Sequence, residues 1–410
     1  MTQLIPVPRR GGRRVLFLNW RDLGSPLGGG SERYLHQVAA GLAGRGDEVT
    51  VRTAHYPGAA PSEVLDGVRY LRRGTPNTVF PTALADLRGG RFGPVDVVVD
   101  CQNGMPFWSR TVTRRPVVVL VHHVHREQWP VAVGPLAGRL GWALESRAAP
   151  AMYRGCQYVA VSESTRAELV GLGVDAERIA VVHNGVAPRP AVSAARGAEP
   201  RLAVLGRLVP HKRVEHALEV VARLLPRWPG LRLTLVGSGY WAPAILARAR
   251  ELGVRSRLDV LGHIDDRAKH EALARSWAHL CPSVKEGWGL AIQEAAQHGV
   301  PTVAYRSAGG TVESILDGRT GLLAGDLDEF ARATERLIED ELLRTRLGTA
   351  AQRRVAEFTW ERATDAFSGV LDMVLAGRRV AGAADRRPDD GTRDETRLPE
   401  RPSRPPQRMP

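Results

Sequence analysis

The sequence predicts an α/β protein with two doubly wound, Rossmann-like domains that face a central cleft. Two observations carry this prediction. Short apolar runs alternate with helical patterns along most of the 410 residues, which is typical of parallel sheets covered by helices. The alternation stops once, in the polar and Pro-rich segment 189–200, and then begins again. We therefore expect an N-terminal domain at 1–188, a linker at 189–200 and a C-terminal domain at 201–358.

The expected N-terminal domain begins with a strand, a Gly-rich loop at 24–31 and a helix from Glu32 to Gly44. Its apolar runs are short and rich in Val, Ile and Leu, as buried parallel strands are. Strands are expected at 14–19, 48–53, 95–100, 117–122, 158–162 and 179–183.

The expected C-terminal domain repeats this pattern, with helices at 212–225 and 242–252. Strands are expected at 201–205, 231–236, 258–261, 279–282 and 302–305. The chain is helical from 327 to about 374, and its last segment, 359–376, forms an amphipathic helix for which a return to the first domain is left open. The tail at 377–410 combines mixed charge with many prolines, so we expect it to be disordered.

Composition narrows the class of protein. Hydrophobic residues make up 43% of the chain and charged residues 25%, as in ordinary globular proteins. No apolar run approaches the length of a membrane span, and the first 14 residues lack the apolar centre of a signal peptide. Three widely spaced cysteines indicate neither a disulfide framework nor a zinc motif. We therefore expect a cytoplasmic protein.

The net charge of +13 comes with a strong bias towards arginine, since Lys212, Lys269 and Lys285 are the only lysines. A GC-rich coding sequence is enough to explain this bias, so the arginines need not have a function. A basic surface nevertheless favours anionic partners such as nucleotides, lipid headgroups or nucleic acid.

The most informative feature is a pair of carboxylates, Glu286 and Glu294, that stand eight residues apart. On a continuous helix they would lie roughly 12 Å apart along the axis, which is too far for one paired acid–base site. The spacing suits a long ligand with hydroxyl-bearing rings at both ends and an anion between them. The helix that opens near Gly289 offers unpaired N–H groups and a positive dipole end to that anion. A sugar joined to a nucleoside by a diphosphate has this layout.

Two strand-end loops offer further ligand groups. Arg207 and Lys212 follow a strand and could stabilise a departing diphosphate, although a solvated loop in an Arg-rich protein is the alternative. The glycines at 28–30 permit close backbone approach, but they form neither a dinucleotide-binding fingerprint nor a P-loop, and a plain flexible loop is the alternative. Glu32 follows as an acid in the first helical turn.

Three histidines, His122, His123 and His125, come just after an apolar strand. A metal site is one interpretation, but no carboxylate or cysteine completes an obvious ligand set. A strand-end histidine that hydrogen bonds a substrate hydroxyl is the preferred interpretation. Asp326 and Asp328 precede a helix and are expected to cap it, not to bind metal.

Taken together, these segments resemble the family 4 retaining glycosyltransferases of the GT-B fold, over about residues 14–375. The most specific shared element is E-x7-E from Glu286 to Glu294, with the run E-G-W-G-L between strand and helix. Supporting motifs are G-G-S-E-R at 29–33, V-H at 121–122, S-E-S-T-R at 162–166, N-G-V at 184–186, G-R-L-V-P-H-K-R at 206–213, G-S-G at 237–239 and A-G-G-T-V-E-S at 308–314.

The resemblance implies a role for each matching residue. Glu286 would hold the hydroxyls of the donor hexose, and Glu294 the ribose of the nucleotide. His122 would contact the transferred sugar, with His123 as the fallback, and Glu32 would face the acceptor. The residues implied for catalysis are His122, Arg207, Lys212 and Glu286. Those implied for donor binding are Gly29, Gly30, Arg207, Lys212, Glu286, Gly287, Trp288, Gly289, Leu290 and Glu294.

The implied reaction transfers a hexosyl unit with retention of anomeric configuration. The departing phosphate would help to remove the acceptor proton, so no protein base is required. Arg207 and Lys212 would supply the positive charge that Mg²⁺ supplies elsewhere, so neither a metal nor a cofactor is expected beside the nucleotide sugar. GDP-mannose and UDP-sugars remain open as donors, and a glycan, a lipid-linked precursor or a small molecule as acceptors.

A helical segment within 133–156 gives an indication of the kind of acceptor. Leu136, Leu140 and Leu144 share a face flanked by Arg139 and Arg147, as in a helix that lies on anionic lipid. An ordinary surface helix is the alternative. Peripheral contact with the inner face of the plasma membrane, in cell-envelope or polysaccharide synthesis, is therefore a hypothesis.

Other functions remain as alternatives. A sugar-nucleotide epimerase of the same fold needs no acceptor, and a phosphorylase would need a lysine-bound pyridoxal phosphate, for which three lysines give few choices. The basic charge would also suit a nucleic-acid-binding protein, but no zinc finger, recognition helix or aromatic–basic stacking array is present. We therefore expect no nucleic-acid partner.

Overall fold

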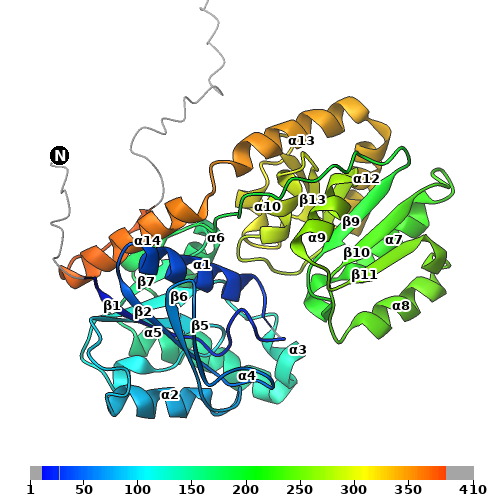
Figure 1. Ribbon diagram of the computed structural model, residues 1–410. Coiled ribbons are helices and arrows are strands. Elements are labelled where there is room, and N and C mark those ends of the chain that lie inside the picture. Colours follow the sequence, from blue (N-terminus) through cyan, green and yellow to red (C-terminus); the bar gives the residue numbers. More distant parts are fainter. Residues whose placement is uncertain (1–11, 27, 385–410) are drawn as a thin grey trace, which may run out of the picture.

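A computed structural model describes residues 12–26 and 28–384 of this protein (Figure 1). Over these residues the chain forms two α/β domains, each built on one sheet. The first sheet runs in the order β15 (Gly382–Ala383), β8 (Ile179–Val181), β7 (Gln157–Ala160), β6 (Val117–Val121), β5 (Val97–Gln102), β1 (Arg14–Leu18), β2 (Glu48–Thr53), β4 (Val68–Arg72) and β3 (Ser62–Leu65). The second runs in the order β11 (Leu258–Gly262), β10 (Arg232–Val236), β9 (Arg201–Leu205), β12 (Ala278–Cys281), β13 (Thr302–Tyr305) and β14 (Gly321–Ala324).

Within the described residues the strand pairs are parallel, apart from the antiparallel β3–β4 pair. All five residues of β6 are buried, as expected for a strand covered by helices on both faces. The alternating side chains of β1 show the same arrangement, since Phe17 belongs to one core cluster of the first domain and Leu16 to another. The predicted fold class, α/β with two doubly wound sheets, is confirmed.

Helices cover both sheets (Figure 1). Those that follow strands of the first sheet are α1 (Gly30–Gly44), α2 (Val79–Arg88), α3 (Trp129–Val133), α4 (Pro135–Ala143), α5 (Ala149–Met152) and α6 (Glu163–Gly171). Those of the second domain are α7 (Val214–Leu224), α8 (Ala242–Glu251), α9 (Asp266–Ala274), α10 (Leu290–Ala296), α11 (Thr311–Ser314), α12 (Leu327–Glu339) and α13 (Glu341–Val355). The Asp326 side chain caps α12 by accepting from the backbone N–H of Glu329 at 2.8 Å, as expected for an N-cap.

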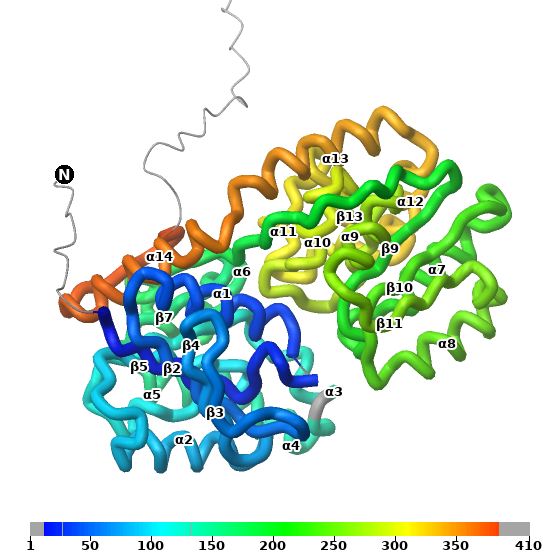
Figure 2. Tube along the Cα trace, viewed as in Figure 1, coloured from blue at the N-terminus to red at the C-terminus, as the bar shows by residue number. Residues whose placement is uncertain are grey.

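The last helix, α14 (Trp360–Leu375), returns to the first domain. Figure 2 shows the chain leaving α13 on the second domain and passing back across the first. There α14 packs against α1, and Phe367 lies in the core with its ring stacked on Phe17 at 6.0 Å. The crossing is hydrogen bonded to the end of the first domain just before the linker, because the Val186 N–H donates to the Phe358 carbonyl at 3.0 Å.

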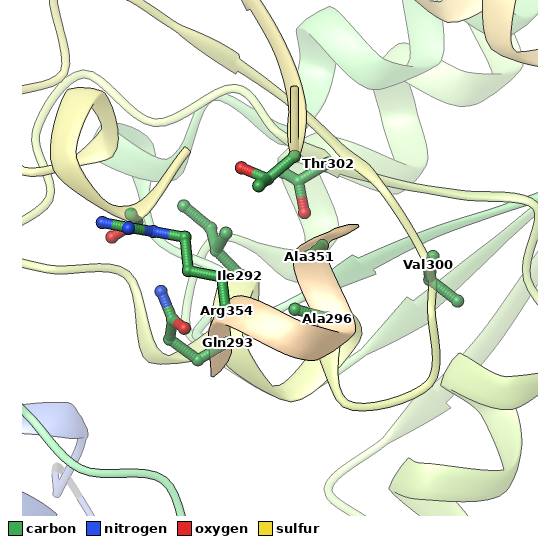
Figure 3. Close-up of a pocket in the computed structure, with 9 residues that line it drawn as sticks. Ile292, Gln293, Ala296, Val300, Thr302, Ala351 and Arg354 are labelled. Atoms are coloured by element: carbon green, nitrogen blue, oxygen red, sulfur yellow. The ribbon is translucent and has the colours of Figure 1, made fainter. Parts of the chain in front are cut away.

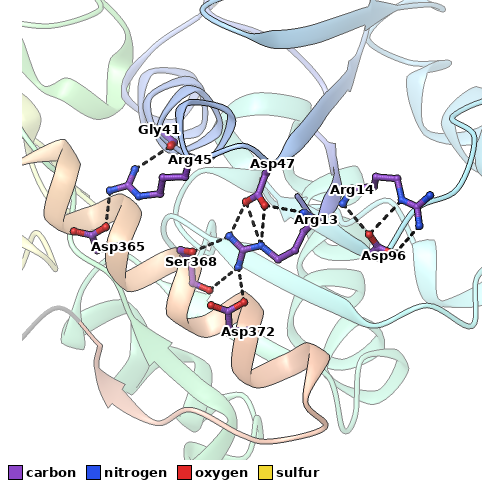
Figure 4. A network of polar contacts seen from close by, with 9 residues as sticks. All are labelled: Arg13, Arg14, Gly41, Arg45, Asp47, Asp96, Asp365, Ser368 and Asp372. Atoms are coloured by element: carbon purple, nitrogen blue, oxygen red, sulfur yellow. Dashed lines mark hydrogen bonds and ion pairs between the residues drawn. The ribbon is translucent and has the colours of Figure 1, made fainter. Parts of the chain in front are cut away.

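A network of charged groups ties α14 to the first domain (Figure 4). The Arg13 guanidinium donates to Asp47 at 2.6 Å and to Asp372 of α14 at 3.0 Å, and both arginine and Asp47 side chains are largely buried. A second pair, Arg45 with Asp365 at 2.5 Å, lies nearer the solvent.

The first residues of the expected disordered tail, up to residue 384, are ordered. Residues 382–383 form β15, which pairs with β8 at the edge of the first sheet. The Gln157 side chain also donates to the Val380 carbonyl at 2.8 Å and accepts from its N–H at 3.0 Å. These hydrogen bonds to the backbone hold residues 380–383 on the first domain, although the segment has few large apolar side chains. The remainder of the expected tail, 385–410, lies outside the described residues.

None of the helices in the described part of the chain is long and apolar enough to cross a membrane. The three cysteines, Cys101, Cys156 and Cys281, are buried and free.

Candidate functional site

The candidate site lies where loops at the carboxyl ends of β9 and β12 meet loops at the carboxyl ends of β1 and β6. Open α/β sheets bind ligands at this edge, because helix openings and free loop backbone gather there. The contacts that join the domains here include Gly29 with Arg207, Gly30 with Leu290, His122 with Gly287, and Arg33 with both Glu294 and Asp266.

Glu286 is held by a lysine and a serine of its own domain. Lys212 Nζ donates to Glu286 Oε1 at 2.5 Å, and Ser283 Oγ donates to the same oxygen at 2.7 Å. Burial alone would raise the pKa of Glu286, but the charge of Lys212 and these hydrogen bonds outweigh it and lower the pKa. The structure therefore brings together two of the predicted residues, Glu286 and Lys212, as an ionised pair.

Glu294 lies in α10 and has different partners. Lys269 Nζ donates to its carboxylate at 2.7 Å, and Arg33 of the first domain approaches it at 3.6 Å. Lys269 also contacts Asp266 at 2.8 Å. Glu286 and Glu294 thus belong to separate charge clusters, in agreement with the expectation that they do not form one acid–base pair.

Arg207 extends from the end of β9 towards the first domain. A Cβ on Gly29 would lie 3.5 Å from Arg207 Nε, which is van der Waals contact, so the guanidinium lies directly against the Gly-rich loop. Burial and the nearby charge of Arg21 lower the pKa of Arg207, while Glu32 and Glu286 oppose this effect. The guanidinium remains cationic at neutral pH, because the pKa of arginine starts far above 7.

The run 287–290 fits tightly between the domains. A Cβ on Gly287 would overlap the carbonyl oxygen of His122, so this glycine permits close contact of the two backbones. Gly289 has φ of 93°, in the left-handed region that favours glycine, and precedes α10. The Leu290 side chain reaches Gly30, whose added Cβ would lie 3.3 Å from Leu290 Cδ1.

The Trp288 side chain lies at the junction between the domains. Trp288 is only 2% exposed and belongs to the core cluster of the first domain, although its backbone belongs to the second. The indole packs on His183 at 4.5 Å and on Phe358 at 4.9 Å between ring centroids. Burial of this large ring stabilises the junction. The contact of Trp288 with the donor remains a prediction, and its backbone is the part of the residue that is left to make it.

His122 is buried and lies edge-on to Tyr34, with ring centroids 5.2 Å apart. Burial lowers the pKa of His122 to about 3, although Glu32 opposes the shift. The imidazole is therefore neutral at pH 7 and can donate or accept one hydrogen bond per ring nitrogen. His123 lies beside it with Nε2 3.3 Å from Gln128 Oε1, and burial lowers its pKa well below the ordinary value.

The third histidine, His125, is paired with a buried carboxyl. Its Nδ1 lies 3.1 Å from Oε1 of Glu145. Within the described residues, no group of three or more His, Cys, Asp and Glu side chains is arranged to hold a metal ion.

Glu32 has a structural role in this arrangement. It accepts from the Gly29 N–H at 2.7 Å, from Arg21 Nε at 2.8 Å and from Ser31 Oγ at 3.0 Å, and its side chain is fully buried. These bonds fix the Gly-rich loop at the start of α1. The predicted contact with an acceptor remains a prediction, and it would require one of these bonds to be exchanged.

A small cavity lies beneath α10 (Figure 3). Its volume is about 10 Å³, roughly enough for one water molecule. It is lined by Ile292, Gln293, Ala296, Val300, Thr302, Ser314, Thr320, Ala351 and Arg354. This cavity is a packing defect behind the helix and is too small for a substrate.

Several residues at the junction were not found from the sequence. Glu313 accepts from the N–H groups of Glu163 at 2.8 Å and Ser164 at 2.7 Å, so a carboxylate of the second domain caps a helix of the first. Lys285 forms an ion pair with Glu168 of the same helix, α6. The S-E-S-T-R motif marked the helix start, but no local signal names its partner in another domain.

Family models match most of the chain. The model described as Glycosyltransferase Family 4 matches residues 28–189, and the model described as Glycosyl transferases group 1 matches residues 189–354. Their boundary coincides with the start of the segment that links the two sheets.

Curated relatives agree with these models. The chain is 25% identical to a glycogen synthase of Mycobacterium tuberculosis, over 89% of this chain and 96% of the relative. It is 28% identical to a GDP-mannose-dependent alpha-(1-6)-phosphatidylinositol monomannoside mannosyltransferase of Mycolicibacterium smegmatis, over 88% and 98%. An exopolysaccharide phosphotransferase of Streptomyces coelicolor is 32% identical over 56% of this chain, but the match spans 25% of that longer protein.

Solved structures show the same architecture. Sucrose-phosphate synthase from Thermosynechococcus elongatus superposes with a TM-score of 0.76 at 20% identity, covering 89% of this chain and 100% of that one. HepE from Anabaena, in complex with UDP and glucose, superposes with a TM-score of 0.69 at 19% identity, covering 88% and 99%.

The fold and these comparisons define the chain as a glycosyltransferase with the GT-B fold. Within that class it belongs to the Glycosyl transferases group 1, with a first domain of the Glycosyltransferase Family 4 type. The resemblance inferred from the motifs is thereby confirmed. The comparisons lend no support to an epimerase or a nucleic-acid-binding protein.

Proposed function

We propose that this protein transfers a hexosyl unit from a nucleotide diphosphate sugar to a glycan, lipid-linked or small-molecule acceptor, with retention and without a metal ion. The observation that carries the proposal is the meeting of the Glu286–Lys212 pair and Arg207 with the Gly29–Gly30 backbone and His122. This places two cations and a carboxylate from one domain against the Gly29–Gly30 and His122 backbone of the other. A sugar diphosphate presents the complementary hydroxyls and negative charge.

The two cations have a direct role in the proposed chemistry. As the bond between the anomeric carbon and the phosphate oxygen breaks, negative charge grows on the diphosphate, and Arg207 and Lys212 stabilise it. Lys212 would exchange its bond to Glu286 for one to phosphate, which leaves Glu286 Oε1 able to accept from sugar hydroxyls.

The proton balance supports a substrate-assisted path. The acceptor oxygen forms its bond to the anomeric carbon on the face that the phosphate leaves, and its proton passes to a phosphate oxygen. The products are a glycoside of unchanged configuration and a nucleoside diphosphate. With its pKa lowered to about 3, His122 is a weak base and suits a hydrogen bond to the transferred sugar.

Two donor classes are candidates. One relative is named as GDP-mannose-dependent, and a superposed structure contains UDP-glucose. We propose a donor from one of these classes, either GDP-mannose or a UDP-sugar.

A panel of sugar nucleotides tests the proposal, read by thermal shift and by donor hydrolysis. We expect one donor class to stabilise the wild-type protein, and Glu286→Ala and Lys212→Ala each to lower turnover about 100-fold or more. Chelation with EDTA should leave turnover unchanged. Glu335→Ala serves as the matched control, because Glu335 pairs with Arg227 on the outer face of the second domain. Unchanged turnover in both site variants would refute the site assignment.

We further propose that the protein works in the cytoplasm and rests on an anionic membrane through α3 and α4. Four large apolar residues are exposed there: Val131 at 55%, Val133 at 50%, Leu136 at 79% and Leu140 at 64%. The exposed side chains of Arg126, Arg139 and Arg147 flank them, whereas Leu144 of the expected apolar face is half-buried. Apolar residues beside cations suit an anionic bilayer surface.

Flotation with vesicles of phosphatidylglycerol and phosphatidylcholine tests this contact. We expect wild-type protein to float with anionic vesicles, and the double variant Leu136→Gln, Leu140→Gln to lose most of that binding. Leu342→Gln is the control, since Leu342 is 83% exposed but lies on the second domain. Wild-type protein that stays wholly in the soluble fraction would refute the membrane contact.

A further inference from the structure

The helical segment after the first-domain histidines contains an irregular turn. α4 ends at Ala143, a π-helical turn spans Leu144–Ala148, and α5 continues from Ala149. A π turn holds one residue more than an α turn and often lies beside a functional site. Here the turn carries Glu145, which is only 1% exposed.

Glu145 accepts hydrogen bonds from a single loop. The His125 backbone N–H donates to both carboxylate oxygens at 3.2 Å, and the Trp129 indole N–H donates at 2.6 Å. The Trp129 ring also packs on Gly141 of α4, where a Cβ would overlap it. Glu145 therefore fixes the middle and the far end of the segment between β6 and α3.

That segment carries the histidines at the domain junction. His125 packs on His123 with ring centroids 4.1 Å apart, and the His122 carbonyl lies against Gly287 of the second domain. A buried carboxyl is costly and persists only when its donors stay in place. Burial raises the pKa of Glu145 to about 8, against the opposing effect of the Trp129 and His125 hydrogen bonds.

We propose that Glu145 is a positioning residue for sugar transfer, which holds His122 and His123 in place through its bonds to His125 and Trp129. The proposal rests on the proposed function, because it requires these histidines to meet the transferred sugar. In the proposed function the second domain binds the nucleotide, so loss of Glu145 should slow turnover without weakening nucleotide binding.

The test compares Glu145→Ala with Glu145→Gln in the full chain, with UDP-glucose and GDP-mannose as donors. Gln keeps a carbonyl acceptor for the Trp129 indole, whereas Ala keeps none. We expect Glu145→Ala to lower kcat about 10- to 100-fold, because small misplacements near the reacting centre are costly. The donor KM should stay within about twofold, and Glu145→Gln should recover most of the rate. An unchanged kcat in Glu145→Ala, or an equal loss in both variants, would overturn the proposal.

Histidine side-chain NMR gives a readout that does not depend on turnover. We expect Glu145→Ala to shift or broaden the ring signals of His122 and His123, and to leave His216 of the second domain unchanged. Asp86→Asn is the matched control, because Asp86 is a buried carboxylate of the same domain that pairs with Arg52 on β2. It should lower Tm and leave kcat unchanged.

The two proposals fail in different ways. If wild-type protein turned over no donor of the sugar-nucleotide panel, the proposed function would be refuted, and the role of Glu145 in transfer with it. If wild-type protein transferred sugar while the His122 and His123 signals were unmoved in Glu145→Ala, the positioning role alone would be refuted.

Discussion

Two carboxylates at the junction between the domains, Glu286 and Glu313, are ionised because donors surround them. Burial by itself would raise the pKa of Glu313, but the bond to His183 and the N–H groups of α6 lower it. Glu286 behaves in the same way beside Lys212. Each carboxylate therefore keeps its negative charge at neutral pH.

Glu313 should make stability depend on pH. Because its folded pKa is lowered, its contribution is present above the unfolded value of about 4.3 and is lost as pH falls through the lower folded value. We expect Glu313→Gln to lower Tm by about 2–4 °C at pH 7, and the difference from wild type to shrink below pH 4. Thermal unfolding of both proteins across this range measures the effect, and a difference that stays constant with pH would contradict it.

A substitution at Gly287 tests the close contact between the Gly287 backbone and the His122 backbone. An alanine there would push its Cβ into the His122 carbonyl, so we expect Gly287→Ala to lower turnover at least about tenfold through displacement of the histidine loop. Gly369→Ala is the matched control, because a Cβ at Gly369 meets no atom within 4 Å and an alanine favours the helix. Steady-state kinetics of the two variants separates the effects, and equal rates would refute the importance of this contact.

At the scale of elements, the sequence predicted most strands of both sheets from their buried Val, Ile and Leu residues, but the short apolar run of β14 was missed. The bounds of β2, β9 and β13 match the predicted ranges, and β5 is shifted by two residues. β3 was missed because most of its side chains are exposed, and β4 because arginines interrupt its apolar residues. β15 could not be predicted, because its stability comes from Gln157 and the free edge of β8 rather than from its own side chains.

Two arginines attach α14 to the first domain, and we expect them to contribute unequally to the free energy of unfolding. Arg13→Ala would leave Asp47 buried without its ion partner, so we expect a loss of about 3 kcal/mol in the free energy of unfolding. Arg45→Ala removes an exposed pair with Asp365 and should cost less than about 1 kcal/mol. Urea unfolding, followed by circular dichroism, measures both, and equal losses would show that burial of the Arg13 network contributes little.

At the scale of the whole molecule, contacts between distant segments set the relation of the two domains. The glycine and charged loops at the strand ends could be located from the sequence, because alternating strands and helices fix which loops share an edge. Their partners could not be located. Glu313 lies 150 positions from Glu163, and no local pattern indicates that one caps the helix of the other. The packing of the Trp288 ring in the core of the first domain could not be located for the same reason.

These contacts predict how readily the domains separate. We expect the double variant Lys285→Ala, Glu313→Ala to increase the radius of gyration in small-angle X-ray scattering, since it removes the ion pair to Glu168 and the cap of α6. Circular dichroism should show that both domains remain folded. Glu335→Ala, which alters a pair within the second domain, should leave the radius unchanged. An unchanged radius in the double variant would mean that Trp288 and the crossing segments suffice.

The return of α14 to the first domain has a consequence for folding during synthesis on the ribosome. Phe367, Val370 and Leu371 of α14 complete a core whose strand and helix residues from the first domain all precede residue 183, and Trp288 joins this core from the second domain. Translation therefore delivers every part of the second domain before it delivers the helix that closes the first. Until α14 is synthesised, the apolar face of the first domain that α14 will cover stays exposed. We expect chaperones to bind this face during that interval.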